Sequence, residues 1–168
     1  IKLDGKNASA HLHRGIIHRN RNELDRALAD LGDAIRLNPK SATAFAHRGL
    51  VYNAKGDTEH AIADFSEAIK LNPKQPGVLL NRAQLYRSER DFDHAIPDFT
   101  AVLEIDPRSV PALVGRGDIH RNKGDYDSAI ADFNRAIKLD TKQSFAYLSR
   151  GNAHHNNREL DQAIAHYN

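Results

Sequence analysis

The sequence predicts an all-α solenoid, a linear stack of antiparallel helical hairpins. Two observations predict it: the chain repeats itself every 34 residues, and apolar residues recur with helical spacing inside each repeat. The columns that keep this interval are Gly15, Gly49, Ala83, Gly117 and Gly151; Ala27, Ala61, Ala95, Ala129 and Ala163; Leu31, Phe65, Phe99, Phe133 and Tyr167; and Pro39, Pro73 and Pro107. Units of this size cannot bury an apolar face alone, so they are expected to stack.

Each repeat encodes two helices, as the second repeat illustrates. Phe45, Gly49 and Tyr52 fall at i, i+4 and i+7, the spacing of one face of an amphipathic helix. Asp57 follows a turn glycine and offers a side-chain oxygen that suits the N-cap of a second helix. The apolar residues after it keep a 3.6-residue period until Pro73, before which helical geometry is disfavoured. Each repeat is therefore predicted to be a helical hairpin.

The period divides the chain into units that together form one predicted solenoid domain. These units are the tail of a preceding repeat at 1–7, repeat 1 at 8–41, repeat 2 at 42–75, repeat 3 at 76–109, repeat 4 at 110–143 and a truncated repeat 5 at 144–168. Residues 1–7 are assigned to a tail because they resemble residues 35–41 and 69–75. We expect the array to continue beyond both ends, and the truncated ends to allow end-to-end self-association.

The composition argues against several classes of protein. The formal net charge is +2, and the 27 % of charged residues are mixed in sign along the chain, which is typical of a solvated helical surface and not of a nucleic-acid-binding arm. Cysteine is absent, which excludes a disulfide framework and a thiolate metal site. No apolar run approaches the roughly 20 residues that span a bilayer. We expect a soluble protein of the cytoplasm or periplasm, with neither nucleic-acid binding nor membrane insertion.

The sequence offers no catalytic, cofactor-binding or metal-binding motif. The ten histidines are not arranged as a His-Glu-x-x-His or comparable metal pattern, and the glycines form no phosphate loop. His18, His120 and His154 stand in the column of Tyr52 and Tyr86, so we expect them to be partly buried packing residues. The segment is therefore predicted not to be an enzyme and to need no cofactor, although a catalytic domain elsewhere on a longer polypeptide stays open.

These columns resemble the tetratricopeptide repeat, whose pattern places an aromatic residue, Leu-Gly and Tyr on the first helix and Ala, Phe, Ala and Pro on the second. The matching residues of repeat 2 are Phe45, Gly49, Tyr52, Ala61, Phe65, Ala68 and Pro73. The resemblance covers the whole chain and implies a right-handed superhelical solenoid of antiparallel helix hairpins. The segment 116–133 is similar to repeats common in bacterial proteins.

One departure from the family pattern recurs in every repeat. The position of the pattern's leucine holds Arg14, Arg48, Arg82, Arg116 and Arg150, and sixteen residues later stand Asp30, Asp64, Asp98, Asp132 and, breaking the series, His166. Because the two positions lie equally far from the turn of an antiparallel hairpin, they can face each other. We predict a repeated Arg–Asp bridge within each hairpin or to its neighbour. A row of anion-binding arginines is the alternative.

The resemblance implies that the first helices line a concave groove that receives a peptide segment. Carried over by register, the expected lining is Leu12, His13, Ile16, Arg19, Asn20, Ala46, His47, Leu50, Asn53, Leu80, Asn81, Gln84, Arg87, Val114, Asp118, Arg121, Leu148, Asn152 and His155. In such a groove the apolar residues would anchor side chains of the peptide, while Arg19, Arg87 and Arg121 would hold carboxylates. The lysines and asparagines that clamp a chaperone tail in some relatives are not matched.

The leading hypothesis is a non-catalytic protein–protein interaction scaffold that binds a peptide segment of a partner protein in the concave groove. Two alternatives stay open: a regulatory or substrate-recruiting arm of a larger enzyme, and a structural module that self-assembles. The sequence does not encode the identity of the partner.

Overall fold

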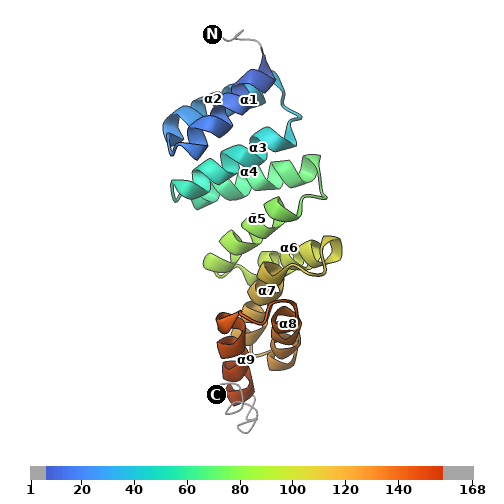
Figure 1. Ribbon diagram of the computed structural model, residues 1–168. Coiled ribbons are helices and arrows are strands. Elements are labelled where there is room, and N and C mark those ends of the chain that lie inside the picture. Colours follow the sequence, from blue (N-terminus) through green and yellow to red (C-terminus); the bar gives the residue numbers. More distant parts are fainter. Residues whose placement is uncertain (1–6, 157–168) are drawn as a thin grey trace. The chain divides into compact units, whose positions relative to one another are not determined.

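The computed structural model describes residues 7–156, and every regular element in that part of the chain is an α-helix. The helices are α1 (Ala8–Asn20), α2 (Leu24–Leu37), α3 (Ala42–Ala54), α4 (Thr58–Leu71), α5 (Pro76–Ser88), α6 (Phe92–Ile105), α7 (Val110–Asn122), α8 (Tyr126–Leu139) and α9 (Ser144–Asn156). Figure 1 shows consecutive helices paired side by side, α1 with α2, α3 with α4 and α7 with α8. The predicted all-α architecture of antiparallel hairpins is confirmed. None of the described helices is long and apolar enough to cross a membrane.

The chain divides into two compact units, unit 1 at Ile1–Val78 and unit 2 at Leu79–Asn168, so all of α5 except its first three residues belongs to unit 2. Within unit 1, α2 packs against α3 and so joins two hairpins; within unit 2, α6 packs against α7 and α8 against α9. We call α1, α3, α5, α7 and α9 the first helices and the others the second helices. The right-handed winding of the array and the repeat boundaries stay predictions. Residues 1–6 and 157–168, which include most of the predicted tail and the end of repeat 5, lie outside the described residues.

Aspartate fixes the start of three of the four described second helices. The side chains of Asp57, Asp91 and Asp125 each accept a hydrogen bond from the backbone N–H three residues later. Glu23 stands at the same position before α2 and makes no such bond. An N-cap of this kind stabilises a helix by about 1 kcal/mol, so the turn sequence determines where each second helix begins.

The residue before each of these N-caps has left-handed backbone geometry. The φ angle is +76° at Gly56 and +80° at Gly124, where glycine adopts it without a steric penalty. Asn22 and Arg90 hold the equivalent positions with φ of +59° and +61°. Side chains disfavour this region by about 1–2 kcal/mol, asparagine less than most, so the turn at Arg90 is strained.

Close contact between the two helices of a hairpin depends on the column of small residues. A Cβ added at Gly49 would lie 2.8 Å from ring atoms of Phe65, and one added at Gly117 would lie 2.9 Å from the ring of Phe133. Both phenylalanine rings are fully buried. Since a buried ring has little room to move, the glycines of this column are a packing requirement and not a functional motif.

Candidate functional site

A bidentate ion pair joins the two helices in each of the first four hairpins, as the sixteen-residue offset predicts. The first-helix arginine donates through Nε and Nη2 to both oxygens of the second-helix aspartate. The Nε–Oδ2 distances are 2.6 Å for Arg14–Asp30, 2.7 Å for Arg48–Asp64 and 2.8 Å for both Arg82–Asp98 and Arg116–Asp132. The four aspartates are only 4–6 % exposed. The predicted Arg–Asp bridge within each hairpin is therefore present in these four hairpins, and each bridge balances the charge of its arginine.

Two arginines of this column also reach the preceding hairpin of their unit. Arg116 Nη1 donates to Thr100 Oγ1 at 3.1 Å, and Arg150 Nη1 donates to Asn134 Oδ1 at 2.5 Å. In both cases the acceptor precedes the arginine by sixteen residues. Burial lowers the pKa of Arg150. His166, the residue predicted to face Arg150, lies outside the described residues, and Arg150 instead contacts the neighbouring hairpin.

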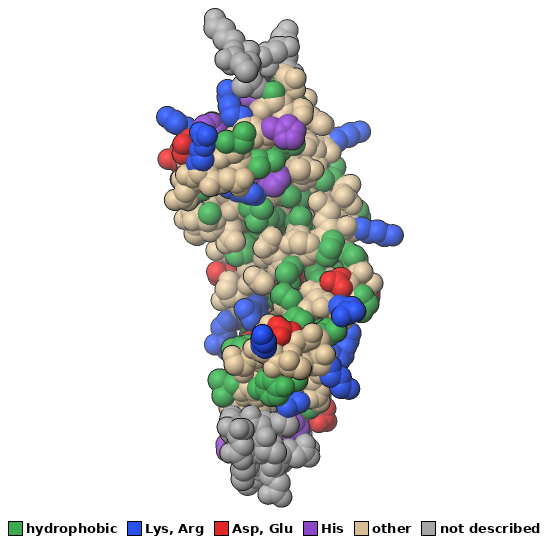
Figure 2. Space-filling view, viewed as in Figure 1, with side chains coloured by type: hydrophobic (Ala, Val, Ile, Leu, Met, Phe, Trp, Pro, Cys, Tyr) green, Lys and Arg blue, Asp and Glu red, His purple; other side chains and the backbone are tan. Residues whose placement is uncertain are grey.

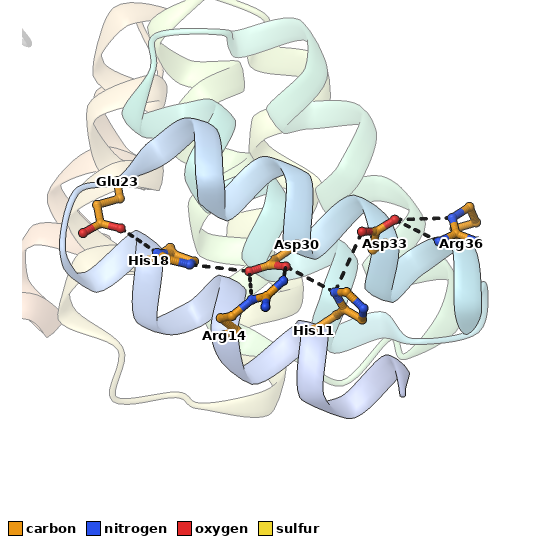
Figure 3. Close-up of polar contacts among 7 residues, drawn as sticks. All are labelled: His11, Arg14, His18, Glu23, Asp30, Asp33 and Arg36. Carbon is orange, nitrogen blue, oxygen red and sulfur yellow. Dashed lines mark hydrogen bonds and ion pairs between the residues drawn. The ribbon is translucent and has the colours of Figure 1, made fainter. Parts of the chain in front are cut away.

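The first hairpin surrounds its bridge with two histidines (Figure 3). His11 Nδ1 lies 3.2 Å from one oxygen of Asp30, and His18 Nε2 lies 3.6 Å from the other. His18 Nδ1 in turn lies 2.6 Å from Glu23 Oε2. The hydrogen bond from Arg14 is the main cause that lowers the pKa of Asp30, against the opposing effect of burial. In the part of the chain that the structure describes, no three His, Asp or Glu side chains are arranged to hold a metal ion.

Near the end of the first helices, the position held by His18, Tyr52 or His120 contacts residues at the start of the following second helix. His120 Nδ1 lies 3.1 Å from the carboxylate that caps α8. At the same position Tyr52 stacks on His60 with ring centroids 5.0 Å apart, and the stack recurs one repeat later. His18, His120 and His154 are half-buried or buried. The predicted burial of these three side chains is confirmed, and their role in packing stays a prediction.

In unit 1, two residues predicted to line the groove pair with each other. Arg19 on α1 and His47 on α3 lie close enough for a hydrogen bond, with 2.7 Å between Arg19 Nη1 and His47 Nδ1. Burial, with a smaller contribution from the charge of Arg19, lowers the pKa of His47. A neutral imidazole nitrogen can accept a hydrogen bond from a guanidinium, so the two findings agree. On the face of unit 1 in view in Figure 2, histidine side chains lie among polar and apolar ones.

The other predicted groove residues of unit 1 differ in their surroundings. Leu12 packs against the buried cluster of Ala27, Leu31 and Val51, so part of its side chain belongs to the core. Ile16 and Leu50 are half-buried and Asn53 is exposed. Unit 1 therefore presents partly exposed aliphatic side chains on α1 and α3, the two helices that also carry the Arg19–His47 pair.

In unit 2, three predicted groove residues form one ionic cluster, which we call the Arg–Asp–Arg triad. Arg87 on α5 donates through Nη1 to Asp118 Oδ2 on α7 at 3.2 Å, and Arg121 donates through Nη2 to Asp118 Oδ1, also at 3.2 Å. Asp118 is buried, at 8 % exposure, whereas both arginines keep solvent-exposed area. The triad connects two successive first helices and has one more positive charge than negative.

A pocket of about 260 Å³ lies beside the triad on the face formed by α5, α7 and α9. Its lining is Gln84, Arg87, Pro111, Val114, Gly115 and Phe145. Phe145 is 49 % exposed although it is a large aromatic residue. We call this surface of α5, α7 and α9, with the triad and the pocket, the first-helix face of unit 2. Asn81 and Asn152, also predicted to line the groove, are half-buried on α5 and α9.

The sequence prediction missed three residues of this pocket: Pro111, Gly115 and Phe145. A signal for one of them was available, because Phe145 is the only aromatic residue in a column that otherwise holds Ser9, Thr43, Gly77 and Pro111. A large apolar side chain at a position that the other repeats leave small or polar points to a local role. Gly115 stands in a column that otherwise holds His13, His47, Asn81 and Ser149. A Cβ added at Gly115 would clash with the buried ring of Phe99, so the packing of α7 on α6 requires glycine there.

The comparison with family models decides the identity of the fold. The sequence model of the tetratricopeptide repeat matches residues 12–76 and again residues 80–144, most of the chain. The chain belongs to the tetratricopeptide repeat family. The resemblance deduced from the repeated columns is thereby confirmed. None of the curated proteins compared with the chain matches it.

Solved structures of other tetratricopeptide repeat proteins are similar over nearly the whole chain. The crystal structure of MamA protein has a TM-score of 0.91 at 17 % identity, covering 95 % of this chain and 87 % of MamA. YrrB, described as a TPR protein with an unusual peptide-binding site, has a TM-score of 0.91 at 21 % identity, covering 97 % of this chain and 84 % of YrrB. A tetratricopeptide repeat protein from Parabacteroides merdae has a TM-score of 0.76 at 26 % identity, covering 95 % and 62 %. At such low identity these structures establish the fold of the chain and the bacterial character of its neighbours.

Proposed function

We propose that this tetratricopeptide repeat chain is a non-catalytic protein–protein interaction scaffold that binds a peptide segment of a partner protein on its first-helix surface. Tetratricopeptide repeats are in general protein–protein interaction modules, and the matched repeats account for most of the chain. The proposed lining is the predicted set on the first helices, to which Pro111, Gly115 and Phe145 are added. YrrB, a structural neighbour, has a peptide-binding site according to its description, which supports the same use of the fold here.

The pocket on the first-helix face of unit 2 is the observation that carries this proposal. It combines the apolar walls of Pro111, Val114 and Phe145 with the amide of Gln84 and the guanidinium of Arg87. Apolar surface with a few fixed polar groups is the composition by which proteins bind and orient a ligand. Carboxylate, histidine and hydroxyl side chains are absent from the lining of this pocket, so its chemistry supports binding and not catalysis.

Filling the pocket tests the proposal. Peptides are first selected from a random library against the full 168-residue chain, and their affinity is measured by fluorescence anisotropy. Gln84→Trp places an indole at the exposed rim of the pocket and is expected to weaken binding at least about tenfold. Ala131→Trp puts the same side chain on an exposed position of the second helix α8 and is the matched control. Equal loss of affinity in the two variants, or none in either, contradicts the proposal.

Two other uses of the chain make different predictions. A regulatory or substrate-recruiting arm of a larger enzyme requires a catalytic domain elsewhere in the complete gene product. The length of that gene product shows whether it has room for such a domain. A self-assembling structural module requires association of the chain with itself, which appears as a molecular mass that rises with protein concentration in light scattering. A concentration-independent monomer mass together with peptide binding supports the interaction scaffold.

A further inference from the structure

We infer that the pocket and the Arg–Asp–Arg triad form one subsite, which selects a segment with a large apolar side chain next to an Asp or Glu side chain. This inference rests on the proposed function and names the chemistry of the partner at that site. Arg87 links the two parts, because it lines the pocket and also donates to Asp118 in the triad. The apolar residue and the acidic residue of the partner therefore lie within about two positions of each other, the spacing of adjacent side chains in an extended segment.

The triad leaves positive charge on the surface. One carboxylate faces two guanidiniums, and the carboxylate is the buried member: the side chain of Asp118 is 12 % exposed, against 37 % for Arg87 and 27 % for Arg121. The pocket lining contains no carboxylate to balance the remaining charge. Solvent and any ligand therefore meet the guanidiniums first, which favours an acidic partner.

The guanidiniums also keep donors that the triad does not use. Each hydrogen bond to Asp118 takes one terminal nitrogen, Arg87 Nη1 and Arg121 Nη2, out of the five N–H groups that each side chain carries. The planar arrangement of such N–H groups matches a carboxylate. The polar side chains at the site are the two guanidiniums and the amide of Gln84, which suit a carboxylate on a side chain of the partner segment. Amidated peptides distinguish this occupant from a C-terminal carboxylate.

The pocket is large enough for the apolar side chain. Its volume is about 260 Å³, and a cavity of roughly 150 Å³ already holds benzene. Phe145 is half-exposed over this space, on α9, while Val114 and Pro111 line it from α7. A phenylalanine or leucine side chain entering the pocket would cover the exposed part of Phe145 and lie beside Arg87.

Selection from a random peptide library against the full chain tests this subsite, with winners resynthesised as C-terminal amides. The expected consensus is a large apolar residue with Asp or Glu within two positions. Replacing that acidic residue of the peptide by Gln or Asn is expected to weaken binding about tenfold in low salt and less in high salt. If the enriched peptides lack an acidic residue, or if they lose binding when amidated, this inference is overturned and the proposed function still holds. If no peptide is enriched, the inference and the proposed function are both overturned.

Substitutions in the triad separate a binding role from a structural one. Asp118→Asn removes the competing carboxylate, so we expect it to bind the acidic peptide about threefold to tenfold more tightly and the Gln or Asn peptide unchanged. Arg87→Gln, Asp118→Asn and Arg121→Gln together leave no buried charge and should bind both peptides equally weakly. Lys138→Gln, an exposed position on α8, makes the same net charge change as the triple variant and should bind as the wild type does. Circular dichroism confirms that each variant is folded. Weaker or unchanged binding of the acidic peptide by Asp118→Asn overturns the inference.

Discussion

The Arg48–Asp64 bridge allows the structural role of the arginine column to be measured. Arg48 donates to both oxygens of Asp64 at 2.7 and 2.8 Å; the side chain of Asp64 is 7 % exposed and that of Arg48 is 25 % exposed. Arg48→Met keeps much of the aliphatic packing but leaves a buried carboxylate without its donors. Removing one partner of a buried pair costs about 3–5 kcal/mol, and partial access of water to the site reduces this to about 2–4 kcal/mol.

The double variant Arg48→Met with Asp64→Leu removes both charges. Because the desolvation cost of the pair then disappears together with its attraction, the double variant should be more stable than Arg48→Met alone by about 1–3 kcal/mol. The assay is urea unfolding followed by circular dichroism, with the midpoint and the slope reported together, since repeat arrays can unfold in steps.

Arg36→Met is the matched control for this prediction. Arg36 pairs with Asp33 at 3.0 Å, but their side chains are 66 % and 43 % exposed, so the loss should stay within about 0.5 kcal/mol. If Arg48→Met destabilises the chain no more than Arg36→Met does, the arginine column is not structural and the reasoning fails.

Three further predictions concern the turns and the helix contact. Arg90→Gly should raise the free energy of unfolding by about 0.5–1 kcal/mol because φ is positive there, and no gain in the urea midpoint would contradict this. Gly117→Ala should lower it by about 1–3 kcal/mol because the new Cβ meets the ring of Phe133, and an unchanged midpoint would show that the ring yields. The hydrogen bond between His60 and Asp57 raises the pKa of His60 above 6.5 and lowers the pKa of Asp57 below 3.8. The stability that this bond adds is therefore fully present between pH 3.8 and pH 6.5. It is lost as the pH rises through the raised pKa of His60 or falls through the lowered pKa of Asp57. The difference in melting temperature between wild type and His60→Gln should therefore be larger at pH 5.5 than at pH 9, and equal differences would exclude the linkage.

The sequence predicted the contacts that lie within one hairpin. The offset of sixteen residues between Arg48 and Asp64 is enough to place them opposite each other, because both are equally far from a turn whose length the repeats preserve. The same local logic predicted the N-cap at Asp57 and the partial burial of His18. These interactions depend only on helix geometry and on the turn.

Contacts between hairpins could not be read in the same way. The 34-residue register placed Arg87, Asp118 and Arg121 in one groove. It gave no indication that Asp118 would accept hydrogen bonds from both arginines, because Arg87 donates from the neighbouring first helix. The pairing of Arg19 with His47 is of the same kind. Both depend on how successive hairpins pack, which the period alone does not specify.

The most direct test of peptide binding on the first-helix surface is a map of the amide chemical shifts that change when a selected peptide is added to the full chain labelled with nitrogen-15. The account predicts the largest changes at Gln84, Val114 and Phe145, with small changes on the exposed side of α8. Changes confined to the second helices, or no changes at peptide concentrations that saturate binding, would contradict it.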